Sequence, residues 1–275
     1  MRGGCARSPE RSHPWESPSC GAGSSGGRGV LIRWPFRIPM YGRGPSGTFS
    51  LVACDPEHRS WGVVVATKPT CVGAVVPWAE WRVGAIATQA NSNYHYGPLG
   101  LGALRRRLPA SEVVARLTRA DPKRESRQLG VVDARGRAAA WTGAKCRAWA
   151  GHVTGEGFSC QGNLLANDRV VPAMVEAFGR TRGTLAQRLF AALVAGERAG
   201  GDRRGMESAA LLVVHREPWF DPAWSDRWID LRVDQHAHPV AELGRILRRE
   251  QASLRGILAA RTARRRRAAK TPERT

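Results

Sequence analysis

The sequence contains no apolar run long enough to cross a membrane, since no stretch approaches the roughly 18 residues that a membrane span requires. The first 47 residues do hold a short apolar stretch at positions 30–32, but Arg33 ends it. That stretch is too short to be the apolar region of a secretory signal peptide. We therefore expect a soluble, cytoplasmic protein without a membrane partner.

Closely spaced cysteine pairs are absent as well. The chain has six cysteines, of which Cys5 and Cys20 fall in the first 47 residues and the other four are widely spaced. No C-x-x-C pair occurs, and this excludes the common zinc and thioredoxin-type spacings. We expect Cys54 and Cys71 to be packed, reduced thiols rather than nucleophiles, and we expect no metal.

Cofactor motifs occur only as superficial matches. Residues 21–26 and 42–47 fit G-x-G-x-x-G, and residues 23–27 fit G-x-S-x-G. None of the three matches follows a predicted strand or opens a predicted helix, so each lacks the structural context that its chemistry needs. We expect no cofactor.

The strongly basic composition is concentrated at the two ends of the chain. The net charge is +20, but residues 1–47 carry seven arginines against two glutamates, and residues 251–275 carry seven arginines and one lysine against one glutamate. The run of four arginines at positions 264–267 is typical of a solvated, disordered end that binds polyanions weakly and in a salt-dependent way. This distribution argues against a specific nucleic-acid partner.

Composition divides the chain into three parts. Residues 1–47 are rich in Gly, Ser, Pro and Arg and read as a disordered leader or propeptide, or as an over-extended translation start with Met40 as the true initiator. Residues 48–250 carry the apolar patterns of a folded domain, and residues 251–275 read as a basic, disordered tail.

Within residues 48–250 the patterns of apolar residues predict an α+β layered architecture. Two hairpins of strands are separated by a pair of helices, of which the second begins with Ser111 as its N-cap. A glycine-rich segment, residues 152–163, reads as a strand that enters a functional or tightly turned loop. Strands are expected at 48–53, 62–67, 72–76, 84–90, 129–133, 138–142, 209–215 and 228–233, and helices at 98–107, 111–120, 172–178, 184–195 and 240–249.

The start of the domain places a threonine in a chemically useful position. Thr48 lies between Gly47 and the first predicted strand. A threonine hydroxyl is a weak nucleophile unless a base lies beside it. If Thr48 became the mature N-terminus, its own α-amino group would be that base.

Several blocks of the sequence resemble an uncharacterised prokaryotic domain family that is assigned to the N-terminal nucleophile (Ntn) hydrolase superfamily. The resemblance runs through residues 48–250 without a break and consists of many short blocks in the same order. The blocks are TFSLVA (48–53), WGVVVATK (61–68), VGAVVP (72–77), ATQA (87–90), GVVD (130–133), GHVTGEG (151–157), CQGN (160–163) and GDRRG (201–205).

The resemblance implies the four-layer αββα Ntn-hydrolase-like sandwich of two antiparallel sheets, with Thr48 as the catalytic nucleophile. Gly47 precedes it as glycine precedes the nucleophilic threonine of proteasome-type subunits, which suggests self-cleavage between the two residues. The expected activity is hydrolysis of a small amide or peptide bond.

We expect Gly162 and Asn163 to stabilise the oxyanion of this reaction, because glycine allows close backbone approach and the amide offers donors. Turn formation is an equally good interpretation of Asn163.

Four further charged residues are candidates for substrate binding. Lys68 follows the second strand, where it would either lower the pKa of the Thr48 amine or be solvated. Asp202 and Arg203, with Arg204, would recognise a substrate carboxylate, hold the site together, or form a surface ion-pair loop. Glu156 lies in the glycine-rich segment as an acid, a base or a turn carboxylate. We expect His152 to be structural.

Tryptophans near the predicted strands leave two interpretations open. They indicate either an apolar or planar substrate or the surface of a homo-oligomer. The residues concerned are Trp78, Trp81, Trp141 and Trp149.

Two alternatives to the amidohydrolase come from other functional classes. The first is a catalytically inactive Ntn-fold binding module with an unknown ligand, in which the leader stays attached or is trimmed without an acyl-enzyme that an electrophilic probe can trap. The second is a nucleic-acid-associated protein that depends on the C-terminal arginines.

Overall fold

The computed structural model describes residues 47–216 and 225–268. The predicted leader, with Cys5 and Cys20, therefore lies outside the described residues except for Gly47, and so do residues 269–275 of the predicted tail. In the described part of the chain, no helix is both long and apolar enough to cross a membrane.

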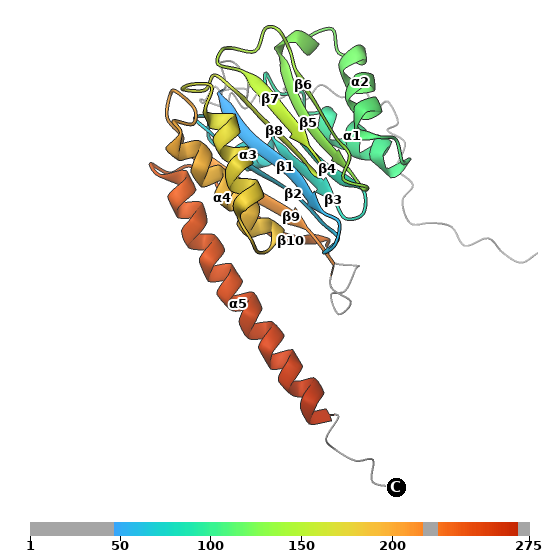
Figure 1. Ribbon diagram of the computed structural model, residues 1–275, viewed down its shortest axis with the longest axis vertical. Coiled ribbons are helices and arrows are strands. Elements are labelled where there is room, and N and C mark those ends of the chain that lie inside the picture. The colour runs from blue at the N-terminus through green and yellow to red at the C-terminus, as the bar shows by residue number, and fades with distance from the viewer. Residues whose placement is uncertain (1–46, 217–224, 269–275) are drawn as a thin grey trace, which may run out of the picture. The chain divides into compact units, whose positions relative to one another are not determined.

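Six antiparallel strands of the described chain form the larger sheet (Figure 1). Their order in space is β10-β9-β2-β1-β8-β7. Because β1 pairs with β2 on one side and with β8 on the other, Thr48 lies at the end of a central strand. The strands are β1 (Thr48–Asp55), β2 (Ser60–Thr67), β7 (Gly151–Gly155), β8 (Phe158–Asn163), β9 (Ser208–Val214) and β10 (Arg227–Val233).

The smaller sheet has four antiparallel strands among the described residues, in the order β3-β4-β5-β6. It packs face to face on the larger sheet, and helices cover the outer face of each (Figure 1). The strands are β3 (Pro77–Glu80), β4 (Gly84–Ala90), β5 (Arg127–Asp133) and β6 (Ala138–Thr142).

Among the described residues, two α-helices pack on the smaller sheet and three on the larger, which makes the four αββα layers that the resemblance implies. The α+β prediction with two antiparallel sheets is thus confirmed. The helices are α1 (Tyr96–Arg105) and α2 (Ala110–Ala120) on one side, and α3 (Val170–Arg180), α4 (Leu185–Arg198) and α5 (Pro239–Ala268) on the other.

Strand alternation distributes the apolar residues of β1 and β2 between two cores. Side chains two apart in a strand point to the same face. Phe49 and Leu51 of β1 therefore join the cluster under α3 and α4, whereas Val52 joins the cluster between the sheets. In the same way Val64 of β2 faces the helices and Val65 faces the other sheet.

The layer between the sheets changes from apolar to polar along β1. Around Val52 it is filled by valines and alanines, but towards Thr48 the inward positions are polar and fully buried. Buried polar groups are tolerated when they are hydrogen-bonded to one another. The residues of this polar layer are Ser50, Gln89, Gln128, Ser159, Gln161 and Asn163.

Two predictions of strands were wrong. Residues 72–76 are not a strand: Val72–Ala74 is a 3-10 helix after Cys71, whose left-handed backbone (φ 58°) turns the chain. The run is apolar because Val72, Val75 and Val76 pack between the sheets. Residues 152–163 are a hairpin of β7 and β8 rather than a strand and a loop, since the inward residues of β8 belong to the polar layer and hide the apolar alternation.

Two helix ends also differ from the prediction. Helix α2 begins at Ala110 after Pro109, so Ser111 is not its N-cap. The Asp133 carboxylate, at the end of β5, accepts a hydrogen bond from the Ala110 amide (3.4 Å) and thereby caps the helix. Helix α5 continues to Ala268, so residues 251–268, predicted to be disordered, are helical.

We predict that Gly130→Ala destabilises the protein. A Cβ at Gly130 would lie 2.2 Å from Oε1 of Gln161, and Gln161 is held by hydrogen bonds to Ser50 and Ser159. Overpacking of this kind typically costs about 1–3 kcal/mol. The free energy of unfolding in urea measures the effect. Gly179→Ala in α3, where a Cβ meets no atom within 4 Å, is the matched control and should not destabilise. Equal losses in both variants would contradict the packing argument.

Candidate functional site

Thr48 is buried, with 3% of its surface exposed, and its hydroxyl contacts a second hydroxyl. The partner is Thr67, its cross-strand neighbour on β2, and the two Oγ1 atoms are 3.1 Å apart. Thr67 Oγ1 also donates a short hydrogen bond to the carbonyl oxygen of Gly47. Because a hydroxyl has one proton to donate, the Thr48 hydroxyl is the donor in the pair of threonines.

A buried carboxylate lies beside Gly47. Asp202 is 1% exposed, and a Cβ placed on Gly47 would lie 2.6 Å from its Oδ1. The carboxylate accepts hydrogen bonds from the backbone amides of Lys68 and Arg204, both at 3.0 Å. It also accepts from the Arg204 guanidinium, from Nε at 3.0 Å and from Nη2 at 2.7 Å. These bonds hold the loop 202–207 against Lys68, the residue that follows β2.

The Arg204 guanidinium reaches the same carbonyl as Thr67. Its Nη2 donates to the oxygen of Gly47 at 3.3 Å while it pairs with Asp202. The carbonyl that precedes Thr48 thus accepts hydrogen bonds from one hydroxyl and one cation. Such donors stabilise negative charge on a carbonyl oxygen during attack by a nucleophile.

The polar layer holds the other side of Thr48. Gln89 Nε2 donates to the Thr48 carbonyl oxygen at 3.3 Å and to Gln128 Oε1 at 2.7 Å. Gln128 Oε1 also accepts from Asn163 Nδ2 (2.9 Å), and Gln128 Nε2 donates to the Gly162 carbonyl oxygen (2.8 Å). Gln128 therefore links the two sheets through Asn163, the cross-strand neighbour of Thr48.

The predicted oxyanion residues lie next to Thr48 but are engaged elsewhere. Asn163 is the cross-strand neighbour of Thr48 on β8, yet its amide nitrogen donates to Gln128. At Gly162 a Cβ would lie 2.5 Å from Leu165 Cδ1, so glycine here allows close packing of β8 against the following loop. The donors that do reach the Gly47 carbonyl, Thr67 and Arg204, come from β2 and from the loop before β9.

The predicted substrate-binding residues separate into near and distant ones. Lys68 lies next to Asp202 through its backbone, but its ammonium pairs with Glu207 at 2.5 Å and its side chain is 41% exposed. Arg203 is exposed, and its amide donates to the Leu164 carbonyl. Glu156 lies in the β7–β8 turn, at the opposite end of β8 from Asn163. Asp202 is thus the predicted residue that borders the Gly47–Thr48 bond most closely, and Arg204 is its partner.

The other candidate residues, which are Cys54, His152 and the four tryptophans, do not gather around Thr48. Cys54 lies at the other end of β1, and burial is the main cause that raises the pKa of its thiol to about 12. Burial lowers the pKa of His152, whose Nδ1 contacts the Thr142 hydroxyl at 2.8 Å. The four tryptophans pack on three different hydrophobic clusters: Trp149 on one, Trp81 on another, and Trp78 and Trp141 on the third. Among the described residues, no group of histidine, cysteine and carboxylate side chains could hold a metal ion.

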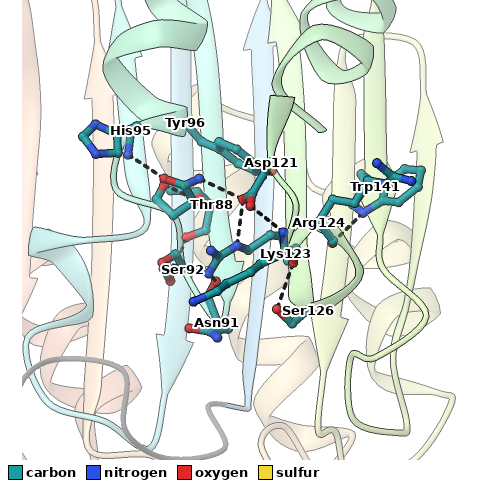
Figure 2. A network of polar contacts seen from close by, with 12 residues as sticks. Thr88, Asn91, Ser92, His95, Tyr96, Asp121, Lys123, Arg124, Ser126 and Trp141 are labelled. Carbon is teal, nitrogen blue, oxygen red and sulfur yellow. Dashed lines mark hydrogen bonds and ion pairs between the residues drawn. The ribbon is translucent and has the colours of Figure 1, made fainter. Parts of the chain in front are cut away.

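A second polar network lies at the end of the smaller sheet where β4 ends and β5 begins, and Figure 2 shows its residues around Asp121. Its centre is Asp121, whose carboxylate accepts from Asn93 Nδ2 (2.8 Å), Tyr96 Oη (3.1 Å), Arg127 Nε (2.9 Å) and the Lys123 amide (2.8 Å). This network fastens the loop between β4 and α1 to the start of β5.

The Asp121 network and the polar layer contain residues that are adjacent in sequence on β4 and β5. Arg127 of the network pairs in register with Ala90, and Gln128 of the polar layer pairs with Gln89. Burial alone would raise the pKa of Asp121, but the hydrogen bonds from its partners outweigh it and bring the pKa down to about 2.

A known protein family matches the domain that contains Thr48 and its neighbours. The model of a family of unknown function, DUF1028, matches residues 48–243. The chain belongs to the DUF1028 family. No match was found among curated proteins.

A solved structure agrees with this assignment. The crystal structure of protein SPO2555 from Silicibacter pomeroyi, also a DUF1028 protein, is 35% identical in sequence. The match covers 74% of this chain and 85% of that one, with a TM-score of 0.66. The two-sheet fold is therefore shared within the family, and the family description leaves the activity open.

We predict that Asp121→Asn destabilises this DUF1028 protein by about 2 kcal/mol, because it weakens hydrogen bonds from a cation and several neutral donors. The folded-state pKa is depressed from 3.8 to about 2, so the wild-type carboxylate contributes stability above about pH 4 and loses it as the pH falls to about 2. Urea unfolding between pH 7 and pH 2 should show this acid-dependent loss in the wild type and a smaller one in the variant. Glu112→Gln, which removes an exposed pair with Arg116, is the control and should cost about 0.5 kcal/mol or less. An unchanged acid slope in Asp121→Asn would contradict the assignment.

Proposed function

We propose that this protein is an Ntn-type amidohydrolase whose nucleophile is Thr48, made available by cleavage of its own Gly47–Thr48 bond. The substrate is a small amide or peptide. One observation carries the proposal: the Gly47 carbonyl oxygen accepts hydrogen bonds from Thr67 and from Arg204, directly beside the Thr48 hydroxyl.

The first stage is self-cleavage. The Thr48 Oγ1 forms a bond to the Gly47 carbonyl carbon, and the carbonyl oxygen becomes an oxyanion held by Thr67 and Arg204. The C–N bond then breaks, the hydroxyl proton passes to the departing nitrogen, and an ester joins Gly47 to Thr48. Water hydrolyses that ester. The products are a leader with a C-terminal carboxylate and a chain that begins with the free α-amine of Thr48.

The second stage repeats the chemistry on a substrate. The space vacated by Gly47 receives the acyl part of the substrate, and the substrate carbonyl oxygen takes the place of the Gly47 oxygen. The new α-amine accepts the hydroxyl proton, since such amines have a pKa of about 7.7–8.0 and are partly neutral near pH 7. The positive charge of Arg204 favours the neutral amine further.

Asp202 limits what fits beside the reacting carbonyl. A side chain on Gly47 would meet its carboxylate at 2.6 to 2.8 Å, so the acyl group of the substrate has a hydrogen or a hydrogen-bond donor at that position. We therefore propose Asp202 and Arg204 as positioning residues of the acyl pocket, with Lys68 and Arg203 at its rim. Asn163 and Gly162 act through the polar layer that holds Thr48.

We predict that Thr48→Ala abolishes cleavage of the leader and that Thr48→Ser retains it. Thr67→Val, which removes one donor to the Gly47 carbonyl and keeps the shape, should slow cleavage by about 100-fold. Intact mass spectrometry of the purified chains over time measures each rate. Thr118→Val, a buried threonine in α2 that bonds only its own helix, is the control and should cleave at the wild-type rate. Cleavage at the wild-type rate in Thr48→Ala would overturn self-processing.

We predict that the cleaved protein is acylated at Thr48 by an electrophilic β-lactone probe. Labelling should rise with pH up to about pH 8, as the α-amine loses its proton. Peptide mass spectrometry locates the adduct, and Thr48→Ala is the control that should stay unlabelled. Absence of an adduct on a chain that does begin with Thr48 would favour the alternative, a binding module without catalysis.

A further inference from the structure

A hollow lies at the end of the molecule opposite Thr48. Thr48 pairs with Thr67 at one end of the β1–β2 ladder, and Asp55 pairs with Ser60 at the other, where the hollow opens. Its volume is about 350 Å³. The hollow is lined by Pro56, Arg59, Trp61, Arg82, Arg107 and Ala134.

Three arginines from three separate turns line this hollow. Arg59 belongs to the turn between β1 and β2, Arg82 to the turn between β3 and β4, and Arg107 to the connection between α1 and α2. All three side chains are exposed. Turns that are distant in sequence thus bring three arginines to the lining of one hollow.

No carboxylate of the described residues forms an ion pair with any of these three arginines. Two acidic residues of the neighbouring strand ends are engaged, since Asp55 pairs with His58 and Asp133 pairs with Arg137. Glu57 shares the turn with Arg59, but it is exposed and these two described residues form no ion pair with each other. The additional contact of Arg82 is with an aromatic ring, since its guanidinium carbon lies 4.6 Å from the centre of the Trp81 ring. Within the described chain, three positive charges therefore share one hollow without a neutralising partner.

The backbone conformation at the three arginines also indicates a role for their side chains. Their φ angles are 48° at Arg59, 61° at Arg82 and 65° at Arg107, all in the left-handed region. Glycine occupies this region at no steric cost, whereas a residue with a Cβ is strained there. Strained residues tend to gather at functional sites. Glycine would suit the local fold better at each position, so a role of the side chains explains arginine.

We propose that this hollow binds the phosphate group of a small phosphorylated molecule. The planar guanidinium matches the oxygens of phosphate in pairs of hydrogen bonds, and three of them complement a dianion better than a single carboxylate. A volume of about 350 Å³ accommodates a phosphate with a small organic group. The site is separate from the Gly47–Thr48 bond and does not depend on the proposed amidohydrolase activity.

Calorimetric titration of the full-length protein with inorganic pyrophosphate at a fixed salt concentration tests the proposal. The wild type should bind with one saturable site on this domain. Arg59→Gly, Arg82→Gly and Arg107→Gly should each weaken binding by about 10-fold or more, and the triple variant should lose it. Because glycine relieves the strained backbone, the melting temperatures should stay equal or rise, which separates loss of the site from loss of the fold.

The control removes the same number of charges elsewhere. A triple variant with Arg198→Ala, Arg248→Ala and Arg249→Ala, all exposed, should bind pyrophosphate as the wild type does. Equal loss of binding in this control would overturn the proposal in favour of diffuse charge. Unchanged binding in the triple glycine variant would also overturn it, since the basic segments outside the hollow would then be the binding site.

A second titration tests the chemical class of the ligand. Inorganic phosphate and glycerol phosphate should compete with pyrophosphate, and acetate should not compete at the same concentration. Competition by acetate as strong as that by phosphate would contradict a phosphate site and indicate a carboxylate site.

Discussion

The hydrogen-bonded polar layer between the two sheets is the constraint on which the position of Thr48 depends. Gln128 accepts from Gln89 and Asn163 and donates to the β8 backbone, so one side chain joins the two sheets beside the start of β1. A buried amide that lost these partners would cost about 1–3 kcal/mol. The layer therefore specifies how the sheets align at this end, whereas hydrogen bonds to Lys68 and Arg204 hold Asp202 beside Gly47.

Much of the fold could be predicted because the strands and helices carry clear patterns. The β-branched runs of β1 and β2 and the apolar face of α2 are local signals, and the helix and strand set follows from them. The wrong predictions share a physical cause, because each local structure depends on contacts with residues that are distant in sequence. Val72, Val75 and Val76 are buried in and just after a 3-10 helix, and an apolar run does not distinguish a buried strand from a buried turn. The Asp133 cap of α2 comes from a strand that lies 23 residues away in sequence.

The site was only partly predictable for a similar reason. Thr48 and Asp202 stand out in short sequence blocks, but Gln89 and Gln128 are single glutamines within strands, and their importance follows from the register that pairs them. Thr67 is one more β-branched residue at a strand end, although its position opposite Thr48 makes it a donor to the Gly47 carbonyl. The choice between Arg203 and Arg204 depends on the turn after Asp202, which no sequence pattern reveals.

The proposed activity depends on one bond, the peptide link between Gly47 and Thr48, and the most direct measurement is N-terminal sequencing of the purified wild-type protein. Two donors on the Gly47 carbonyl and a hydroxyl beside it predict a chain that begins with Thr48. A wild-type chain that retains Gly47 after prolonged incubation at neutral pH would contradict the account, because Thr48 would then lack the α-amine that serves as its base.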